Sequence, residues 1–372
     1  MSNDNNLQAR QAEVTRKLAL VRAFMQEHQL DALLLSRRDN FAWLTCGGDD
    51  AVFHDTSLGV AVLLITNDAQ YIVFSEIERY RVSDEELRGL AWEPVCYDWH
   101  ADKAAVLQRL IGGQRAAGDD GALSLPDVSA SFAELRYALM PEEIVRYRQL
   151  GAATAASMNR TCRGIRPGQT EFEVAASLTA DLLARGIYAP VCMVASDARI
   201  QQYRHPIPTQ KAIDKYALVV VGAQQYGLFA SMSRLVCFGK PDDEIARKQQ
   251  ACMDIDARMM AATRVGATAG DVLQCGIEAY AHNGYADQWT KHHQGGATGY
   301  LPRDYVAVPG LGETVRLNQA FSWNPTIAGA KSEDTYIVEE TGLDILTAID
   351  DWPMRESGGQ DARYQRPDML IL

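Results

Sequence analysis

Histidines in two polar segments are the residues best suited to acid–base chemistry. His205 lies between Arg204 and Pro206 in a proline-rich, loop-like stretch, and His292 and His293 form a pair just before a glycine turn. An imidazole titrates close to neutral pH, so it can both accept and donate a proton. A lone loop histidine is more often simply solvated, and a polar loop entering a turn would also explain the pair. The spacing alone leaves both interpretations open.

Charged and hydroxyl side chains occur in the strand-like segments of the second half. Arg234 is flanked by apolar residues, so it needs a partner if it is buried. It could form a structural ion pair with Glu333 or Asp334, or it could bind a substrate. Ser231 and Ser233 are two residues apart, which would place both on one face of a strand. No nucleophile-elbow motif surrounds them, so a serine-hydrolase role is disfavoured.

The first part of the chain has the pattern of a compact α/β domain. Apolar residues in 10–29 recur at close to the helical period. Asp31–Ser36 is typical of a buried strand, and the β-rich runs 59–66 and 69–76 are joined by an Asn-Asp turn. Another helix is predicted at 102–112. This alternation of helices and strands predicts an α/β fold.

Pro141, Glu142 and Glu143 indicate the start of a new helix, because proline and acidic residues suit the first helical turn. We therefore place the domain boundary just before it and predict two domains, 1–135 and 136–372. The second domain is predicted to contain helices at 141–163, 171–186 and 243–264, and strands at 217–221, 227–238 and 318–323.

Composition excludes some classes of partner. The formal net charge is −12 and no basic stripe is present, which argues against nucleic-acid binding. No apolar run approaches the roughly 18 residues that a membrane-spanning helix needs. The seven cysteines are scattered and odd in number, which suits a reducing compartment. We expect a cytoplasmic protein that binds neither nucleic acid nor membrane.

Five segments resemble the pita-bread fold that methionine aminopeptidase, prolidase, aminopeptidase P and creatinase share. They follow the order of that family: LRYALMPEEIVRYR (135–148), YRHPIPT (203–209), VVVGAQQYGLFASMSRLVCFGKP (219–241), HHQGGATGYLPRD (292–304) and AFSWNPTIAGAKSEDTYIVEETG (320–342). The N-terminal residues are similar to the smaller α/β domain of the family. The resemblance implies a creatinase-like α/β domain, then a pita-bread catalytic domain, and a homodimer.

The metal ligands of that family are largely missing. Its metal-dependent members hold two divalent ions with two Asp, one His and two Glu, a donor set that suits such ions. By resemblance, these five positions fall on Val220, Ser231, His292 (with His293 as a rival), Asn324 and Glu333. One carboxylate remains, which is too little negative charge for two dications. We therefore predict no metal and no cofactor.

Creatinase works without a metal, and the resemblance extends to its functional positions. Its motif histidine is followed eleven residues later by an arginine, and Arg303 follows His292 by the same interval. The resemblance implies that His205 handles protons and that Arg303 binds a carboxylate. Glu333 and His292 would orient water or substrate. The implied substrate-binding residues are Arg204, Ser231, Arg234, His293, Arg303, Asn324, Lys331 and Asp334.

The predicted function is metal-independent hydrolysis of a small anionic amide or amidine. Several of the implied site residues are cationic, which favours a negatively charged substrate: Arg204, Arg234, Arg303 and Lys331. Ser233 replaces the acidic residue that precedes the motif arginine in creatinase, so creatine itself is disfavoured.

Other functions are compatible with the same residues. The chain could be a degenerate Xaa-Pro peptidase that keeps one ion, a non-catalytic module that binds peptides, or a C–N or C–O lyase. Fold alone does not decide among these possibilities.

Overall fold

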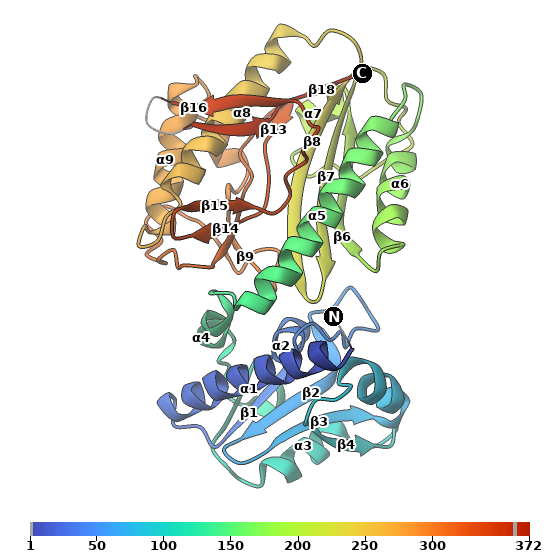
Figure 1. Cartoon of the computed structure of the whole chain (residues 1–372), viewed down its shortest axis with the longest axis vertical. Helices are drawn as coiled ribbons and strands as arrows, with labels where there is room; N and C mark the ends of the chain where they lie inside the picture. Colours follow the sequence, from blue (N-terminus) through green and yellow to red (C-terminus); the bar gives the residue numbers. More distant parts are fainter. Residues whose placement is uncertain (1–2, 360–362) are drawn as a thin grey trace. The chain divides into compact units, whose positions relative to one another are not determined.

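The computed structural model describes residues 3–359 and 363–372 (Figure 1). The chain divides into two compact units, Met1–Arg136 and Tyr137–Leu372. Each unit has its own sheets and its own hydrophobic core. Within the described ranges, no helix combines the length and apolar character that crossing a bilayer requires.

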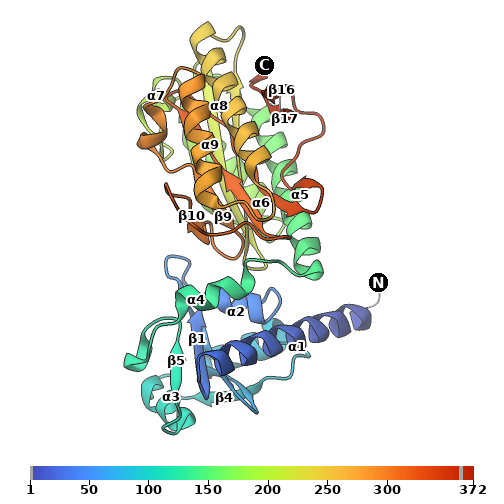
Figure 2. The same ribbon diagram turned by 90° about the vertical axis from the view of Figure 1, so that its left-hand side faces the viewer.

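The first unit is built on one mixed sheet of order β4-β3-β2-β1-β5 (Figures 1 and 2). Leu34, Val62 and Val73 of the sheet pack against Val106 and Leu107 of α3. The elements are α1 (Asn3–Glu27), β1 (Ala32–Arg37), α2 (Arg38–Leu44), β2 (Leu58–Thr66), β3 (Gln70–Ser75), β4 (Glu93–Tyr97), α3 (Lys103–Ile111), β5 (Ala116–Gly118) and α4 (Ser129–Ala133), with short 3₁₀ or π turns at Glu76–Glu78, Arg81–Glu86, Ala122–Ser124 and Glu134–Arg136.

Capping residues set the ends of α3. The Asp102 side chain accepts a hydrogen bond from the backbone N–H of Ala104, and Gly112 ends the helix in the left-handed conformation, with φ of 60°. The prediction of 102–112 therefore differs from the observed helix only by these two caps. The first helix is longer than predicted, because a polar stretch without apolar periodicity extends it to Asn3.

The second unit has two larger sheets, each covered by helices. The sheet β18-β8-β7-β6 lies beside α5 and α6, and the sheet β10-β9-β11-β14-β15 lies beside α8 and α9 (Figure 1). Met259 of α8 and Leu273 of α9 pack in one core with Phe321 and Trp323 of β11.

The helices of this unit are α5 (Pro141–Gly164), α6 (Glu171–Leu183), α7 (Ala198–Gln202), α8 (Asp243–Ala262) and α9 (Ala269–His282), with a 3₁₀ turn at Gln288–Lys291. The strands are β6 (Tyr188–Ser196), β7 (Tyr216–Gln225), β8 (Leu228–Cys237), β9 (Gly295–Thr298), β10 (Tyr305–Val306), β11 (Ala320–Trp323), β12 (Thr326–Ile327), β13 (Ala330–Lys331), β14 (Tyr336–Glu339), β15 (Gly342–Ile345), β16 (Met354–Gly358), β17 (Arg363–Pro367) and β18 (Leu370–Ile371).

A buried ion network joins the elements of the second unit. Arg234 on β8 donates to Asp334 at 2.8 Å, and Arg366 on β17 lies 2.8 Å from Asp334 and 2.7 Å from Asp256 on α8. All four side chains are 1% exposed. Buried charges are stable only when they are paired, so the network fixes where β8, β17 and α8 meet.

We predict that Arg366→Met lowers the free energy of unfolding by about 3 kcal/mol or more, because it leaves the buried carboxylate of Asp256 without its cation. Denaturation in guanidinium chloride measures the change. Arg363→Met on the same strand is the control, because its ion pair with Glu356 is exposed and should contribute less than about 1 kcal/mol. Equal losses in the two variants would show that the network does not stabilise the fold.

Candidate functional site

A cavity of about 230 Å³ lies in the second unit, where β6, β7 and β8 face the segments that follow η5 (Gln288–Lys291). Its size suits a short substrate and is smaller than the pockets typical of drug-sized ligands. The polar lining consists of His205, Ser231, His293, Arg303, Asn324, Lys331 and Glu333. The apolar wall consists of Val191, Met193, Val220, Val221 and Pro302, with Gly222 beside them.

Glu333 is a buried carboxylate clamped by two cations. Its Oε1 lies 3.2 Å from the guanidinium of Arg303, and its Oε2 lies 3.4 Å from the ammonium of Lys331. The hydroxyl of Ser233 donates to Oε2 at 2.6 Å. Burial alone would raise the pKa of Glu333, but Lys331, Arg303 and Ser233 outweigh it and hold the pKa at about 2. Glu333 is therefore an anion at neutral pH.

The register of the strands puts Glu333 in this position. Ser233 on β8 pairs with Glu333 through an isolated antiparallel bridge, and the backbone N–H of Ser233 donates to the Glu333 carbonyl at 3.1 Å. Successive side chains of a strand point to opposite faces. Ser233 therefore lies on the cavity side, whereas Arg234 lies in the buried ion network.

A pair of metal ions, which the family resemblance would imply, does not fit these side chains. Val220 has no ligand atom, and Ser231 and Asn324 offer only neutral oxygens. Both oxygens of Glu333 already contact cations of the chain itself. Two dications require several anionic oxygens, and the site has one occupied carboxylate.

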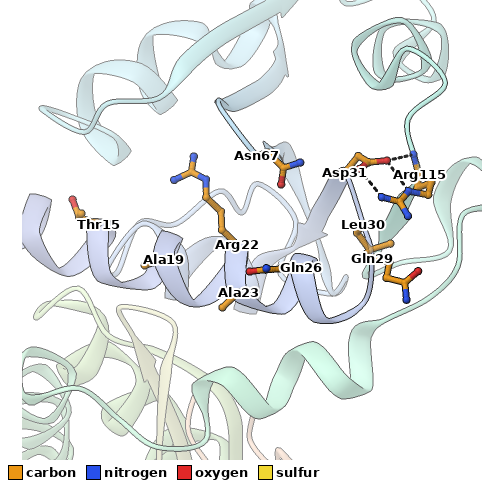
Figure 3. A pocket seen from close by; sticks show the side chains of 10 residues that line it. All are labelled: Thr15, Ala19, Arg22, Ala23, Gln26, Gln29, Leu30, Asp31, Asn67 and Arg115. Atoms are coloured by element: carbon orange, nitrogen blue, oxygen red, sulfur yellow. Dashed lines mark hydrogen bonds and ion pairs between the residues drawn. The ribbon is translucent and has the colours of Figure 1, made fainter.

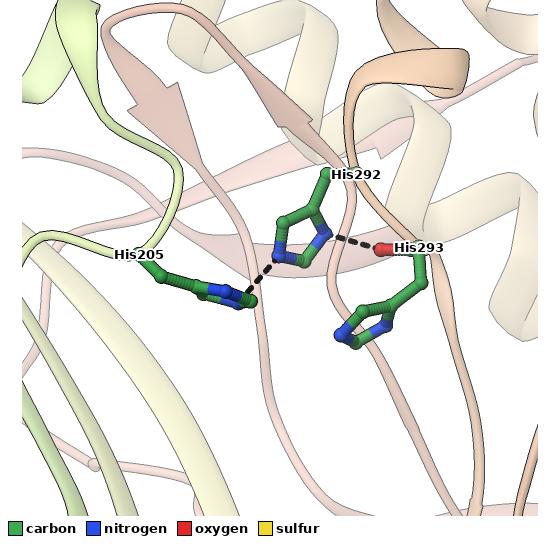
Figure 4. A group of neighbouring side chains, drawn as sticks. All are labelled: His205, His292 and His293. Carbon is green, nitrogen blue, oxygen red and sulfur yellow. Dashed lines mark hydrogen bonds between the residues drawn. The ribbon is translucent and has the colours of Figure 1, made fainter.

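The imidazoles of His205, His292 and His293 form one group (Figure 4), and those of His205 and His293 line the cavity. The Nε2 atoms of His205 and His292 are 2.8 Å apart, and the Nδ1 atom of His292 contacts the backbone carbonyl of His293. The rings of His292 and His293 stack with centroids 4.3 Å apart. Of this adjacent pair, His293 lines the cavity, whereas His292 contacts it through His205.

The electrostatic environment keeps the histidines neutral. Burial is the main reason that the pKa of His292 is lowered to about 3, and the positive charge of Lys331 is the next largest cause. The pKa of His293 is lowered to about 4, mainly by burial and next by the positive charge of Arg303. Burial and Lys331 also lower the pKa of His205. At neutral pH each ring therefore keeps one nitrogen lone pair for a proton or another ligand.

Two buried polar atoms at the cavity have no partner among the described residues. They are the Nε atom of Arg303, a donor, and the Oδ1 atom of Asn324, an acceptor. Buried polar atoms are rarely left without a hydrogen bond, so both point to groups that a ligand would supply. The ligand should present an acceptor to Arg303 and a donor to Asn324.

Three of the residues expected to bind substrate lie outside the cavity lining. Arg234 and Asp334 pair with each other in the buried network, which corrects their assignment in favour of the structural ion pair. Arg204 donates to Thr326 and Gln288, so it braces the loop beside His205 rather than the cavity.

The sequence reasoning missed the apolar wall that β6 contributes. Val191 and Met193 are half-buried residues of β6, a strand that begins with exposed residues and ends in three buried ones, so it shows no simple alternation. Gly222 on β7 allows the close approach of β6, since a Cβ there would lie 3.1 Å from Cβ of Val191.

The first unit has a separate surface hollow along α1 (Figure 3). Its charged groups are already satisfied: Arg115 donates to Asp31 at 2.9 Å, and Arg22 donates to Gln70 at 2.8 Å. Its lining contains no histidine.

Comparisons with known proteins match both units. Residues 145–340 match the model of metallopeptidase family M24, and residues 17–148 match the creatinase/prolidase N-terminal domain. An Xaa-Pro dipeptidase of Pyrococcus furiosus is 21% identical over 350 residues, 87% of this chain and 95% of that protein. The probable dipeptidase PepE of Mycobacterium tuberculosis is 26% identical over 56% of this chain, and the chain spans only 58% of PepE.

The solved structures agree on the fold. PepE of Mycobacterium ulcerans superimposes with a TM-score of 0.78 at 19% identity, covering 97% of this chain and 99% of that one. The matches confirm the predicted resemblance and the predicted α/β fold, with a small creatinase-like domain followed by a pita-bread domain.

We predict that Glu333→Gln lowers the free energy of unfolding by about 3 kcal/mol at pH 7, because the folded protein depresses the carboxyl pKa from 4.5 to about 2. A depressed pKa stabilises the fold fully above pH 4.5, and this stabilisation disappears as the pH falls toward 2. Denaturation of both proteins from pH 7 to about pH 3 should show a shrinking difference.

Glu339→Gln is the control for this prediction, because its ion pair with Arg148 is half exposed. Its effect should stay below about 1 kcal/mol. If Glu333→Gln greatly lowered the free energy of unfolding but this loss did not change with pH, ion pairing of Glu333 with Arg303 and Lys331 would not be its cause.

Proposed function

This chain belongs to metallopeptidase family M24, and we propose that it hydrolyses the C–N bond of a short, carboxylate-bearing peptide without the paired metal ions of that family. One observation carries the proposal: Arg303 and Lys331 occupy both oxygens of Glu333, where paired ions would need a free carboxylate. The cations of the chain replace part of the positive charge that metals would supply.

The charge and size of the cavity support this class of substrate. Two cations face one carboxylate, which leaves a net positive charge for an anionic group. Arg303 would bind the substrate carboxylate through its free Nε–H, and Asn324 would accept a hydrogen bond from a substrate N–H. We therefore replace the small amide or amidine predicted from the sequence with a dipeptide, in line with the names of the relatives.

The histidines would supply the proton transfers. Neutral His205 would take a proton from the attacking water and later donate it to the leaving nitrogen. The Lys331 ammonium would stabilise the negative oxygen of the tetrahedral intermediate. Glu333, ionised at neutral pH, would hold Arg303 and Lys331 in position and take no part in proton transfer. The homodimer and the cytoplasmic location implied by the sequence stay predictions.

We expect His205→Ala to lower kcat/KM for dipeptide hydrolysis by about 10²–10⁴-fold, the range for loss of a general base. An amino-acid release assay over a panel of dipeptides, with Xaa-Pro among them, measures the change. His282→Ala, at the exposed end of α9, is the matched control and should keep full activity. Undiminished hydrolysis by His205→Ala would rule out this mechanism.

We expect Arg303→Gln to remove the preference for a free carboxylate. The wild-type protein should hydrolyse a dipeptide at least about tenfold better than the same dipeptide with a C-terminal amide, since a charged hydrogen bond contributes about 1.5–3 kcal/mol. In Arg303→Gln the two substrates should become nearly equal, because the cation that distinguishes them is gone. If the ratio is unchanged in the variant, the carboxylate binds elsewhere.

A further inference from the structure

The three imidazoles of the site lie close enough to share one metal ion (Figure 4). One ring nitrogen from each of His205, His292 and His293 falls within 4.8 Å of the other two. A tetrahedral zinc ion with Zn–N distances of about 2.0–2.1 Å holds its nitrogen ligands roughly 3.3 Å apart. Small rotations of these side chains would therefore bring all three nitrogens to ligand distance.

Hydrogen bonds already orient His292 as a ligand. Its Nδ1 contacts the carbonyl of His293, which requires the proton on Nδ1, so the Nε2 lone pair accepts a hydrogen bond from His205 that a metal ion would replace. Nε2 points at His205, toward the centre of the group. Metal-binding histidines commonly donate their second N–H to a backbone carbonyl in this way. The side chain of Gln294 also donates to the His292 carbonyl, which fixes the backbone.

The charges around the group favour an ion of moderate affinity. The three rings are neutral at neutral pH and so have free lone pairs. Lys331 and Arg303 repel a cation, and Glu333 offsets one of these two charges. We therefore expect binding weaker than that of structural zinc sites.

We propose that His205, His292 and His293 bind a single divalent ion of the zinc or cobalt type through three imidazole nitrogens, with water as the fourth ligand. Imidazole nitrogens prefer zinc, cobalt, nickel and copper over magnesium and calcium, which prefer oxygen. This site differs from the paired-ion centre of the family, because two of its three ligands lie outside the positions of that centre.

Binding of this ion should inhibit the hydrolysis proposed above. The ion would occupy the lone pair of His205 that accepts the proton from water, so one ring cannot serve both purposes. This consequence rests on the proposed function, whereas the site itself does not.

Cobalt titration of the metal-stripped full chain, prepared without a histidine tag, tests the site. We expect one Co²⁺ per chain, a visible spectrum of tetrahedral nitrogen ligation, and no thiolate charge-transfer band from the free cysteines. Zinc should displace the cobalt. Each of His205→Ala, His292→Ala and His293→Ala should weaken binding at least about tenfold, whereas His282→Ala should not change it.

Failure of Co²⁺ and Zn²⁺ to bind stoichiometrically, or equal affinity in the three variants and the wild type, would overturn the site. Titration needs no substrate, so an inactive protein that binds one ion supports the site and counts only against the proposed hydrolysis. An active protein that binds zinc without inhibition would overturn the link to His205.

Discussion

The site depends on the pairing of one buried carboxylate with two cations from the same chain. Glu333 keeps its charge inside the fold only because Arg303 and Lys331 contact its oxygens. Burial, and then the positive charges of Lys331 and Arg303, lower the pKa of the nearby imidazoles, whereas Glu333 partly offsets this effect. The site can therefore stay folded and polar although this chain lacks the other carboxylates of the family's metal centre.

Much of the fold follows from local patterns in the sequence. The helix that starts at Pro141 was predicted because proline and two glutamates suit a first turn, and β8 was predicted as a strand-like run at 227–238. Helix α9 was missed, since Gly270 and Gly276 weaken its pattern. Strands as short as β12 and β13 carry too few residues to show any periodicity.

Several of the residues predicted for the site lie around one cavity, whereas the contacts between them were harder to predict. The motif spacing led to His205, to His292 with His293 as its rival, and to Arg303. Of these, His205, His293 and Arg303 line one cavity, and His292 does not. The partner of Arg234 could not be derived, because the choice between Glu333 and Asp334 depends on a register between residues about 100 positions apart. Alternation along each strand sends Glu333 to the cavity and Asp334 to the ion network.

The ion network also makes the frame of the site depend on contacts between elements that lie far apart in the sequence. Arg366 on β17 supplies the cation between Asp256 and Asp334, and β18 completes the sheet beside β8. Because β8 and α8 precede these strands by about 100 residues, Asp256 lacks the cation of Arg366 until the late-docking β17 packs against α8. The second unit should consequently reach its final packing only when β17 and β18 have docked, and its apolar faces stay exposed until then.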